Sequence, residues 1–338
     1  MSKRILVVRT DRAGDVVMIT PMLREIKKKY PDCFLATLTQ KHTSQILQNN
    51  PYVDKMIIDD LRLRTFWKVI KEIKQYMFTD ALLVLPTERA AYQLFIAGIK
   101  NRIGVGHKIY EIITFMKSVS RNKYIPLRHE ADYCMDMARR IGVETNNLSP
   151  EIFLTYEEID KGKNLLSELC GGDNLYKIIV HTGSGKSAPN WSEDKYFELI
   201  KKILERFKDK KFTIFLTANE MSDEFLEKIS SLKSNKIINT TNRIKSLREL
   251  IIFINSVDLV IVSSTAPAHI SDSLKKSAIV IHCHRSMSCA KYWGTLNKKT
   301  IDLEVSEEFC NLHCSKDKEI CKIEDGISTD EVLKNINF

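Results

Sequence analysis

Three short stretches of this chain carry residue types that suit work on a phosphorylated substrate. The first, residues 262–270 (VSSTAPAHI), follows an apolar β-branched run and leads into a helical pattern. Ser264 and Thr265 suit a helix N-cap and Pro267 suits the first turn, so free backbone N–H groups and His269 are expected to meet an anion there. An ordinary loop whose serine and threonine only cap a helix explains the same residues equally well.

The second stretch, residues 181–191 (HTGSGKSAPNW), also follows a predicted strand. Its hydroxyl groups, its glycines and Lys186 suit a diphosphate, because glycines let backbone N–H groups approach the phosphate oxygens closely. The Walker A pattern GxxxxGK[ST] is not met, since only one residue separates Gly183 from Gly185. ATP hydrolysis is therefore not expected.

The third stretch, residues 9–15 (RTDRAGD), follows the first predicted strand. Asp15 is a candidate general base, because a carboxylate in a partly desolvated cleft can take a proton from an attacking hydroxyl group. Its alternative role is to N-cap the helix that follows. Gly14 permits a close approach of the backbone, but the stretch lacks the GxGxxG fingerprint of dinucleotide-binding proteins.

The elements that must position these stretches alternate between strands and helices. Two successive series of this kind predict an α/β protein with two doubly wound domains and a ligand site in the cleft between them. The boundary falls in a polar segment, which gives domains of residues 1–155 and 156–338, and the last helix (328–335) is a candidate to pack back on the first domain. Residues 65–77 predict an amphipathic helix whose basic face leaves two roles open, packing on the core or lying on a membrane.

The charge of the chain is unevenly distributed. Residues 1–130 contain 23 Lys and Arg against 12 Asp and Glu, whereas the whole chain of 338 residues has a net charge of +9. A basic first half suits an anionic partner, such as a phosphorylated or carboxylated substrate or an acidic membrane surface. Nucleic acid is the weakest of these partners, because no nucleic-acid-binding motif accompanies the charge.

The eight cysteines and the hydropathy pattern indicate the cellular compartment in which the protein works. No signal peptide and no apolar run of membrane-spanning length is evident, so a cytoplasmic protein with reduced thiols is expected. Cys310, Cys314 and Cys321 cluster near the C-terminus, with His313 among them, and make a zinc site conceivable. The absence of a CxxC pair favours structural or incidental cysteines and no metal.

In order along the chain, these residues resemble the bacterial lipopolysaccharide heptosyltransferases, glycosyltransferase family 9. Each motif alone is weak, and their order from end to end carries the resemblance. The motifs are Val8-Arg9, Gly14-Asp15, Thr20-Pro21, residues 101–104 (NRIG), residues 129–133 (HEADY), residues 183–191, residues 246–250 (SLREL) and residues 264–269 (STAPAH).

The resemblance implies a GT-B fold of two Rossmann-like domains and a metal-independent, inverting transfer of a heptose from an ADP-sugar to a lipopolysaccharide core acceptor, with no cofactor. It implies that Asp15 is the base. It places the donor on the C-terminal domain and an anionic, lipid-linked acceptor on the N-terminal domain, with peripheral contact to the inner membrane. The implied donor-binding residues are Gly183, Ser184, Lys186, Ser187, Ser264, Thr265, Ala266 and His269, with either Glu220 or Glu224 for the ribose. The implied acceptor-binding residues are Arg12, Gly14, Arg62 and Arg64.

Two departures from the family pattern keep other functions open. Pro189 stands where the family usually has a lysine, and residues 264–266 (STA) replace a common Asp-Thr-Gly, which puts the donor sugar in doubt. The alternatives are a sugar-nucleotide epimerase of the same architecture and a non-catalytic homologue that only binds nucleotide sugars. An epimerase would need no acceptor, and a binding protein would turn nothing over.

Overall fold

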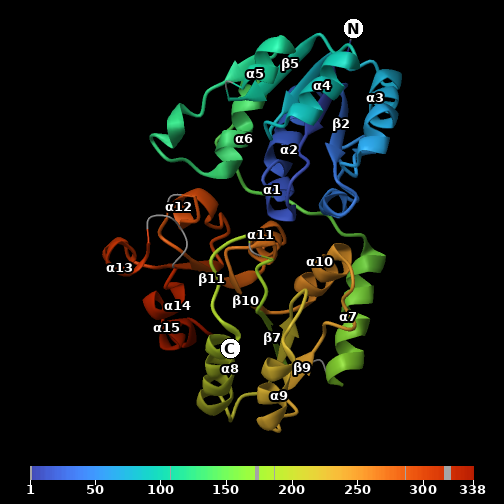
Figure 1. Cartoon of the computed structure of the whole chain (residues 1–338). Helices are drawn as coiled ribbons and strands as arrows, with labels where there is room; N and C mark the ends of the chain where they lie inside the picture. Colours follow the sequence, from blue (N-terminus) through green and yellow to red (C-terminus); the bar gives the residue numbers. More distant parts are fainter. Residues whose placement is uncertain (1, 107, 172–174, 186, 286, 316–320) are drawn as a thin grey trace. The chain divides into compact units, whose positions relative to one another are not determined.

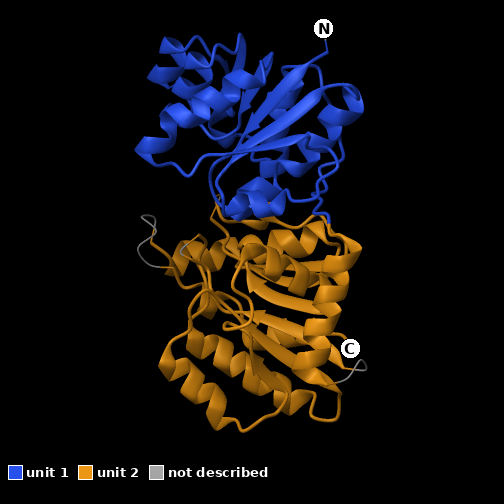
Figure 2. Ribbon diagram, turned by 90° about the vertical axis from the view of Figure 1, so that its right-hand side faces the viewer, with its two compact units in different colours: residues 1–153 blue, residues 154–338 orange. Residues whose placement is uncertain are grey.

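The computed structural model describes residues 2–106, 108–171, 175–185, 187–285, 287–315 and 321–338. By its internal contacts the chain divides into two units, residues 1–153 and 154–338 (Figure 2). Each unit is built on one six-stranded parallel sheet flanked by helices (Figure 1). The predicted α/β fold with two doubly wound sheets is therefore confirmed. Within the described ranges, no helix has the length and apolar character needed to cross a bilayer.

The first sheet has the strand order β3-β2-β1-β4-β5-β6, and every pair is parallel. Its strands are β1 (Arg4–Val8), β2 (Phe34–Thr39), β3 (Lys55–Ile58), β4 (Asp80–Leu83), β5 (Asn101–Val105) and β6 (Lys117–Val119). The side chains of residues 5–8 are fully buried because helices cover both faces of the sheet. The chain runs outward from β1 to β3 and then returns to β4 on the other side of β1. Ligands of such sheets bind beyond the carboxyl ends of the strands at this reversal point.

The connections between the parallel strands place the helices of the first unit on the two faces of its sheet. The helices are α1 (Ala13–Val17), α2 (Thr20–Lys29), α3 (Phe66–Gln75), α4 (Glu88–Ile96), α5 (Ile109–Ile113) and α6 (Glu130–Arg139), with 3-10 turns η1 (Thr43–Ile46), η2 (Leu63–Thr65) and η3 (Asn122–Tyr124). Helices α3, α4 and α5 share one face, where neighbours pack together, and α2 and α6 pack together on the other. The amphipathic helix predicted at 65–77 is α3, and it buries Val69, Ile70 and Ile73 in the core.

The second sheet repeats the first, with the order β12-β11-β10-β7-β8-β9. Its strands are β7 (Tyr176–His181), β8 (Phe212–Thr217), β9 (Ile237–Asn239), β10 (Leu259–Ser263), β11 (Ser277–His282) and β12 (Thr300–Glu304). The reversal point lies between β7 and β10, whose residues His181 and Val262 are paired. The loops that follow these two strands therefore emerge side by side.

The helices of the second unit also flank their sheet. They are α7 (Tyr156–Cys170), α8 (Glu193–Arg206), α9 (Asp223–Ser231), α10 (Leu247–Ser256), α11 (Ala266–Ser273), α12 (Ala290–Trp293), α13 (Glu307–His313), α14 (Ile323–Gly326) and α15 (Thr329–Lys334). Helices α7, α10 and α11 pack in sequence, and α8 packs with α9 and α15. The last helix is fastened to α8 of its own unit, since Thr329 donates to Glu198 at 2.7 Å and Lys202 bonds the Thr329 hydroxyl at 2.9 Å.

Candidate active site

A buried arginine organises the carboxyl edge of the first sheet. Arg9 is the first residue after β1, and only 3% of its surface is exposed. Its guanidinium bonds the carboxylates of Asp11 and Glu130, each at 2.8 Å, and also that of Asp15. Arg121 bonds the second oxygen of Glu130 at 3.2 Å. Three carboxylates and two guanidinium groups therefore form one ion-pair cluster at the reversal point of the sheet.

The carboxylate of Asp15 lies at the outer edge of this cluster. Its side chain is 18% exposed, against 2% for Glu130, so among these two acids it is the one that a substrate can reach. Arg9 fixes one carboxylate oxygen, which orients the group. Helix α1 begins at Ala13 with Arg12 as its N-cap, so the alternative N-cap role predicted for Asp15 is wrong. Asp15 instead occupies the first turn, where the helix dipole favours a negative charge.

Asp11 carries the clearest perturbation in this cluster. Burial raises the pKa of Asp11 from 3.8 to about 6, although the neighbouring Arg9 guanidinium acts in the opposite direction. The native protein therefore binds a proton at Asp11 more readily than the unfolded chain does at pH values between these two. In that range the contribution of Asp11 to the free energy of unfolding falls as the pH rises.

Asparagine does not titrate, so the variant Asp11→Asn lacks this pH-dependent loss of stability. Its free energy of unfolding relative to that of the wild type should therefore increase as the pH rises from about 4 to about 7. Urea denaturation of both proteins at the two ends of this range measures the difference in free energy of unfolding. A difference that is the same at both pH values would contradict the assignment.

The predicted acceptor-binding residues are only partly gathered around Asp15. Arg12 is exposed at the start of α1, next to the cluster, but Gly14 is buried because the helix begins earlier than the sequence suggested. Arg62 and Arg64 are exposed in the loop and turn after β3. Strand β3 is two strands away from β1, a separation of about 10 Å at the usual spacing. The structure therefore brings Arg12 to Asp15, and it leaves Arg62 and Arg64 at the far side of the same edge.

In the second unit, the loop after β7 is clamped to the end of β10. The Asn190 amide donates to the Thr182 carbonyl at 2.7 Å, and its oxygen accepts from Ser263 at 2.5 Å and from Tyr196 at 2.8 Å. Gly183 lies against the loop after β8, where an added Cβ would be 3.3 Å from the Ala218 Cβ. Asn190, which the sequence did not single out, thus joins two of the predicted motifs.

The predicted diphosphate loop turns tightly within this clamp. Ser187 donates to the Ser184 carbonyl through both its amide, at 2.9 Å, and its hydroxyl, at 2.6 Å. Gly185 has a φ of +52°, a conformation that other residues adopt only under strain. Lys186 lies outside the described residues. Among the described residues, the buried hydroxyl of Thr182 has no hydrogen-bond partner.

The loop after β10 leads directly into α11, as predicted. Thr265 is the N-cap, but its hydroxyl turns back to the Ser263 carbonyl at 3.3 Å and makes no capping bond to the helix. The expectation that Ser264 or Thr265 caps this helix with its side chain is therefore wrong. Thr265 and His269 are 5% and 3% exposed, and the His269 ring lies 5.3 Å from the Trp293 ring. Ala266 is half-buried and is therefore more accessible than either of these residues.

The structure separates the two candidates for the ribose. Glu224 lies in the first turn of α9 and pairs with Lys228 at 2.7 Å. Glu220 is exposed in the loop between β8 and α9, one residue after Asn219, whose backbone N is 3.6 Å from an added Gly183 Cβ. Glu220 is therefore next to the diphosphate loop, and Glu224 is engaged elsewhere.

His181 ends β7 beside this loop. Burial lowers the pKa of His181 to about 4, and its Nδ1 lies 2.8 Å from the Thr217 hydroxyl. The imidazole is therefore neutral near pH 7 and supplies no positive charge to a phosphate.

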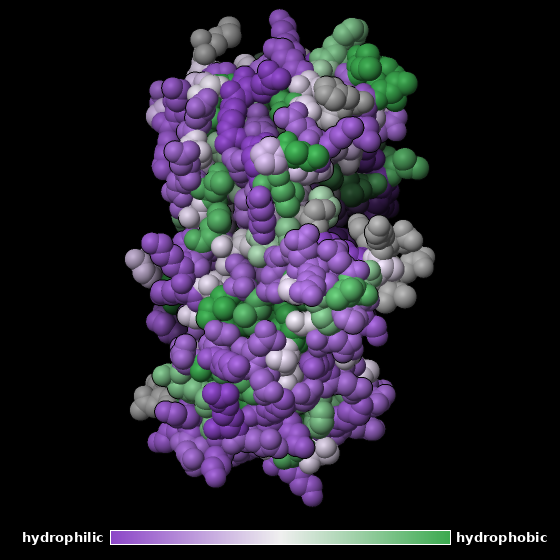
Figure 3. All heavy atoms as spheres, turned by 90° about the vertical axis from the view of Figure 1, so that its left-hand side faces the viewer, coloured by the Kyte–Doolittle hydropathy of each residue, from purple (hydrophilic) through white to green (hydrophobic). Residues whose placement is uncertain are grey.

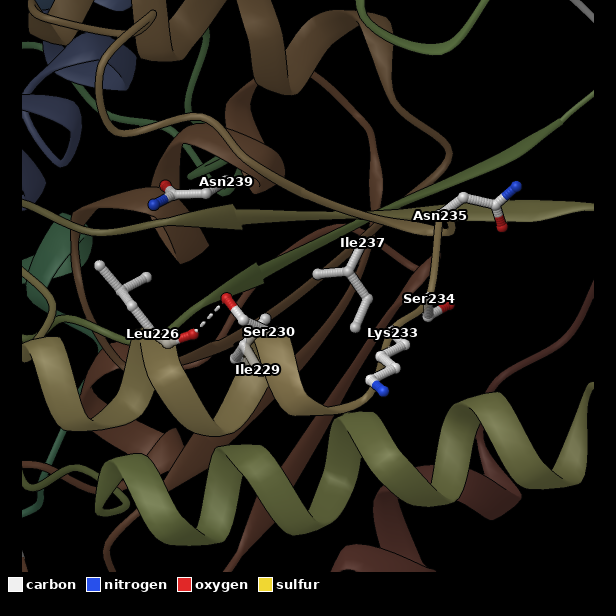
Figure 4. Close-up of a pocket in the computed structure, with 8 residues that line it drawn as sticks. All are labelled: Leu226, Ile229, Ser230, Lys233, Ser234, Asn235, Ile237 and Asn239. Carbon is white, nitrogen blue, oxygen red and sulfur yellow. Dashed lines mark hydrogen bonds between the residues drawn. The ribbon is translucent and has the colours of Figure 1, made fainter.

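Two other features of the molecule do not add to the site. All eight cysteines are free thiols, and the described residues contain no group of three or more His, Cys, Asp or Glu side chains arranged to hold a metal. A surface pocket between α9 and β9, lined by residues such as Ser230 and Lys233, includes none of the predicted site residues (Figure 4).

Two doubly wound units, each with polar loops at its reversal point, make up the architecture of the GT-B fold. The model of glycosyltransferase family 9 (heptosyltransferase) matches residues 66–322, and the chain belongs to this family. The protein is accordingly a glycosyltransferase of the heptosyltransferase type.

Individual relatives are distant in sequence and similar in fold. Lipopolysaccharide heptosyltransferase 1 of Campylobacter coli is 24% identical over 82% of this chain and 83% of its own. The structure of a family 9 glycosyltransferase from Veillonella parvula superposes with a TM-score of 0.82, at 20% identity, over 99% of this chain and 96% of its own. Escherichia coli heptosyltransferase WaaC with ADP gives a TM-score of 0.69, at 13% identity, over 98% of both chains.

Proposed function

We propose that this glycosyltransferase transfers a heptose from an ADP-sugar to a hydroxyl group of a lipopolysaccharide core acceptor at the cytoplasmic face of the inner membrane, with inversion and without a metal. The observation that carries the proposal is the Asp15 carboxylate, which Arg9 holds at the reversal point of the first sheet while its side chain stays partly exposed. One oriented carboxylate of this kind is what an inverting transfer requires on the acceptor side.

In the proposed reaction, the acceptor oxygen attacks the anomeric carbon of the donor sugar from the side opposite the diphosphate. Its proton passes to the Asp15 carboxylate as the new C–O bond forms. The bond between the anomeric carbon and the phosphate oxygen breaks, and its electron pair leaves with ADP. The configuration at the anomeric carbon is therefore inverted in a single displacement.

We place the nucleotide-sugar donor on the second unit because several groups that can bind a diphosphate meet at the reversal point of its sheet. The diphosphate would lie between the backbone of Gly183, Ser184 and Ser187 and the N-terminus of α11 at Thr265 and Ala266, where the helix dipole favours an anion. A bound oxyanion would also satisfy the Thr182 hydroxyl, whose burial without a partner costs about 1–3 kcal/mol. The relative WaaC, whose structure contains ADP, supports an adenine nucleotide.

The remaining donor and acceptor residues complete the proposal. Ser264 and His269 would line the back of the diphosphate site, and Lys186 would supply a positive charge to the diphosphate. Glu220 would bond the ribose hydroxyls. On the first unit, Arg12 and the backbone near Gly14 would lie closest to the reacting hydroxyl, and Arg62 and Arg64 would hold outlying phosphate or carboxylate groups of the acceptor.

Calorimetric titration with ADP, UDP and GDP tests the donor assignment. The wild type should bind ADP at least about tenfold more tightly than UDP or GDP. Glu220→Ala should weaken ADP binding about tenfold, because the ribose loses its hydrogen-bond acceptor, whereas the matched control Glu224→Ala should not change it. Binding of UDP alone, or equal losses in both variants, would contradict the assignment.

A further inference from the structure

Helix α5 turns an apolar face toward solvent. Ile109, Ile112 and Ile113 recur at helical spacing on one side of the helix and are 75%, 73% and 51% exposed. The acidic residue of the helix, Glu111, is buried on the opposite side and accepts a hydrogen bond from Ser118 at 2.7 Å. This arrangement is the reverse of an ordinary surface helix, which buries its apolar side.

The apolar face continues onto the neighbouring helix. Phe115, two residues after α5, is 77% exposed, and its ring lies 6.3 Å from the ring of Phe95 at the end of α4, which is 40% exposed. We call Phe95, Ile109, Ile112, Ile113 and Phe115 together the α5 surface. Figure 3 views the molecule from the side on which α5 lies in Figure 1, and it shows hydrophobic side chains exposed near the top of that face.

The segment that carries most of the α5 surface is rich in basic residues and almost without acids. Residues 97–129 contain seven Lys and Arg and one acidic residue, the buried Glu111. Lys100, Lys108 and Lys117 are exposed, and Lys108 and Lys117 flank the apolar residues of α5 in the sequence. Exposed apolar side chains in a basic segment suit the interface of an anionic lipid bilayer, because the apolar groups enter the acyl boundary while the ammonium groups meet the headgroups.

A second apolar site lies on the same face of the sheet. Leu63 in turn η2 and Trp67 in α3 are 90% and 66% exposed, and the ring of Trp67 packs on that of Phe66. Lys68 and Lys71 are exposed on the same helix. Tryptophan beside basic residues is typical of side chains that lie at the headgroup level of a membrane.

We propose that the α5 surface, together with Leu63 and Trp67, docks on an anionic lipid bilayer. The proposal rests on the proposed function insofar as a lipid-linked acceptor would be presented there. A second copy of the chain is the less suitable occupant, because a symmetric contact would bring the same basic segment against itself. Anionic headgroups neutralise these charges.

Co-sedimentation with vesicles tests the docking directly. The full chain should sediment with vesicles of phosphatidylglycerol and phosphatidylethanolamine and should stay in solution with phosphatidylcholine alone. The double variant Ile112→Glu, Phe115→Glu should reduce the bound fraction about tenfold or more, because carboxylates are repelled by the headgroups and cannot enter the acyl boundary. Lys108→Glu with Lys117→Glu should also weaken binding, and raised salt should weaken it further.

A matched control separates this effect from a general loss of apolar surface. Leu312→Glu changes a side chain that is 71% exposed on α13 in the second unit, and it should leave vesicle binding unchanged. Failure of the wild type to bind anionic vesicles, or unchanged binding by the double variant, would overturn the proposal. Sedimentation velocity tests whether a second copy of the chain occupies the surface instead. A wild-type dimer that is absent in the double variant, together with no vesicle binding, would also overturn the proposal.

The two proposals fail in distinguishable ways. Transfer to a water-soluble acceptor fragment should proceed at the wild-type rate in the double variant, because the α5 surface takes no part in the chemistry. If the wild type transfers no sugar to that fragment, the proposed function is rejected, and the vesicle result is unaffected.

Discussion

Asp15→Asn should lower kcat for sugar transfer about 1,000-fold, since loss of a positioned general base typically costs 100- to 10,000-fold. The asparagine oxygen can still accept a hydrogen bond from Arg9, so the fold and the affinity for ADP should be close to those of the wild type. Initial rates with saturating donor and acceptor measure the change in kcat, and calorimetry checks that donor binding is retained.

The matched control is Asp32→Asn, which alters an exposed aspartate between α2 and β2 in the same unit. It should leave kcat within about twofold of the wild type, because surface substitutions away from a site are usually neutral. A loss of less than about tenfold in Asp15→Asn would show that Asp15 is not the base.

Arg9→Met should destabilise the first unit by about 3–5 kcal/mol, because three carboxylates lose a buried counter-charge and only Arg121 remains to offset Glu130. Glu130 has a side chain that is only 2% exposed, and Asp11 and Asp15 would lose the group that holds them. Thermal and urea denaturation should show a separate, earlier transition, and sugar transfer should be lost at the temperature where that unit unfolds.

Two further variants make the interpretation specific. Arg243→Met breaks an exposed pair with Glu168 in the second unit and should cost about 0.5 kcal/mol or less. Arg9→Lys keeps the positive charge but loses the planar fork that bonds several carboxylates, so its stability should fall between those of Arg9→Met and the wild type. Equal effects of Arg9→Met and Arg243→Met would contradict the structural role of Arg9.

The fold was predictable because its signals are local and strong. Buried parallel strands such as β1 and β10 form continuous apolar runs, and their alternation with amphipathic helices leaves few arrangements open. Strands β5, β6 and β12 escaped prediction. Arg102 and Gly104 interrupt the apolar run of β5, β6 has only three residues at a sheet edge, and no residue of the edge strand β12 is fully buried. The outward-facing helix α5 escaped for a similar reason, since its five residues are too short for a periodic pattern.

The places of the predicted site residues in the fold were predictable, and their contacts were less so. The stretches that hold Asp15, Gly183 and Thr265 each follow a strand, as predicted, and Asp15 lies in the helix that begins after β1. The sequence did not show that Arg9 pairs with Glu130, because 121 residues separate them and only the sheet brings them together. For the same reason Asn190 was missed. The burial of His269 depends on Trp293, which follows it in the chain by 24 positions and is not part of the motif.

The most direct measurement is nuclear magnetic resonance of the product formed from ADP-heptose and a core acceptor in the presence of a chelator. We expect a glycosidic bond whose anomeric configuration is opposite to that of the donor, formed at the same rate with and without the chelator, and no change in the donor when the acceptor is left out. A retained configuration, a reaction stopped by the chelator, or conversion of the donor alone would contradict direct displacement by an acceptor hydroxyl that Asp15 deprotonates.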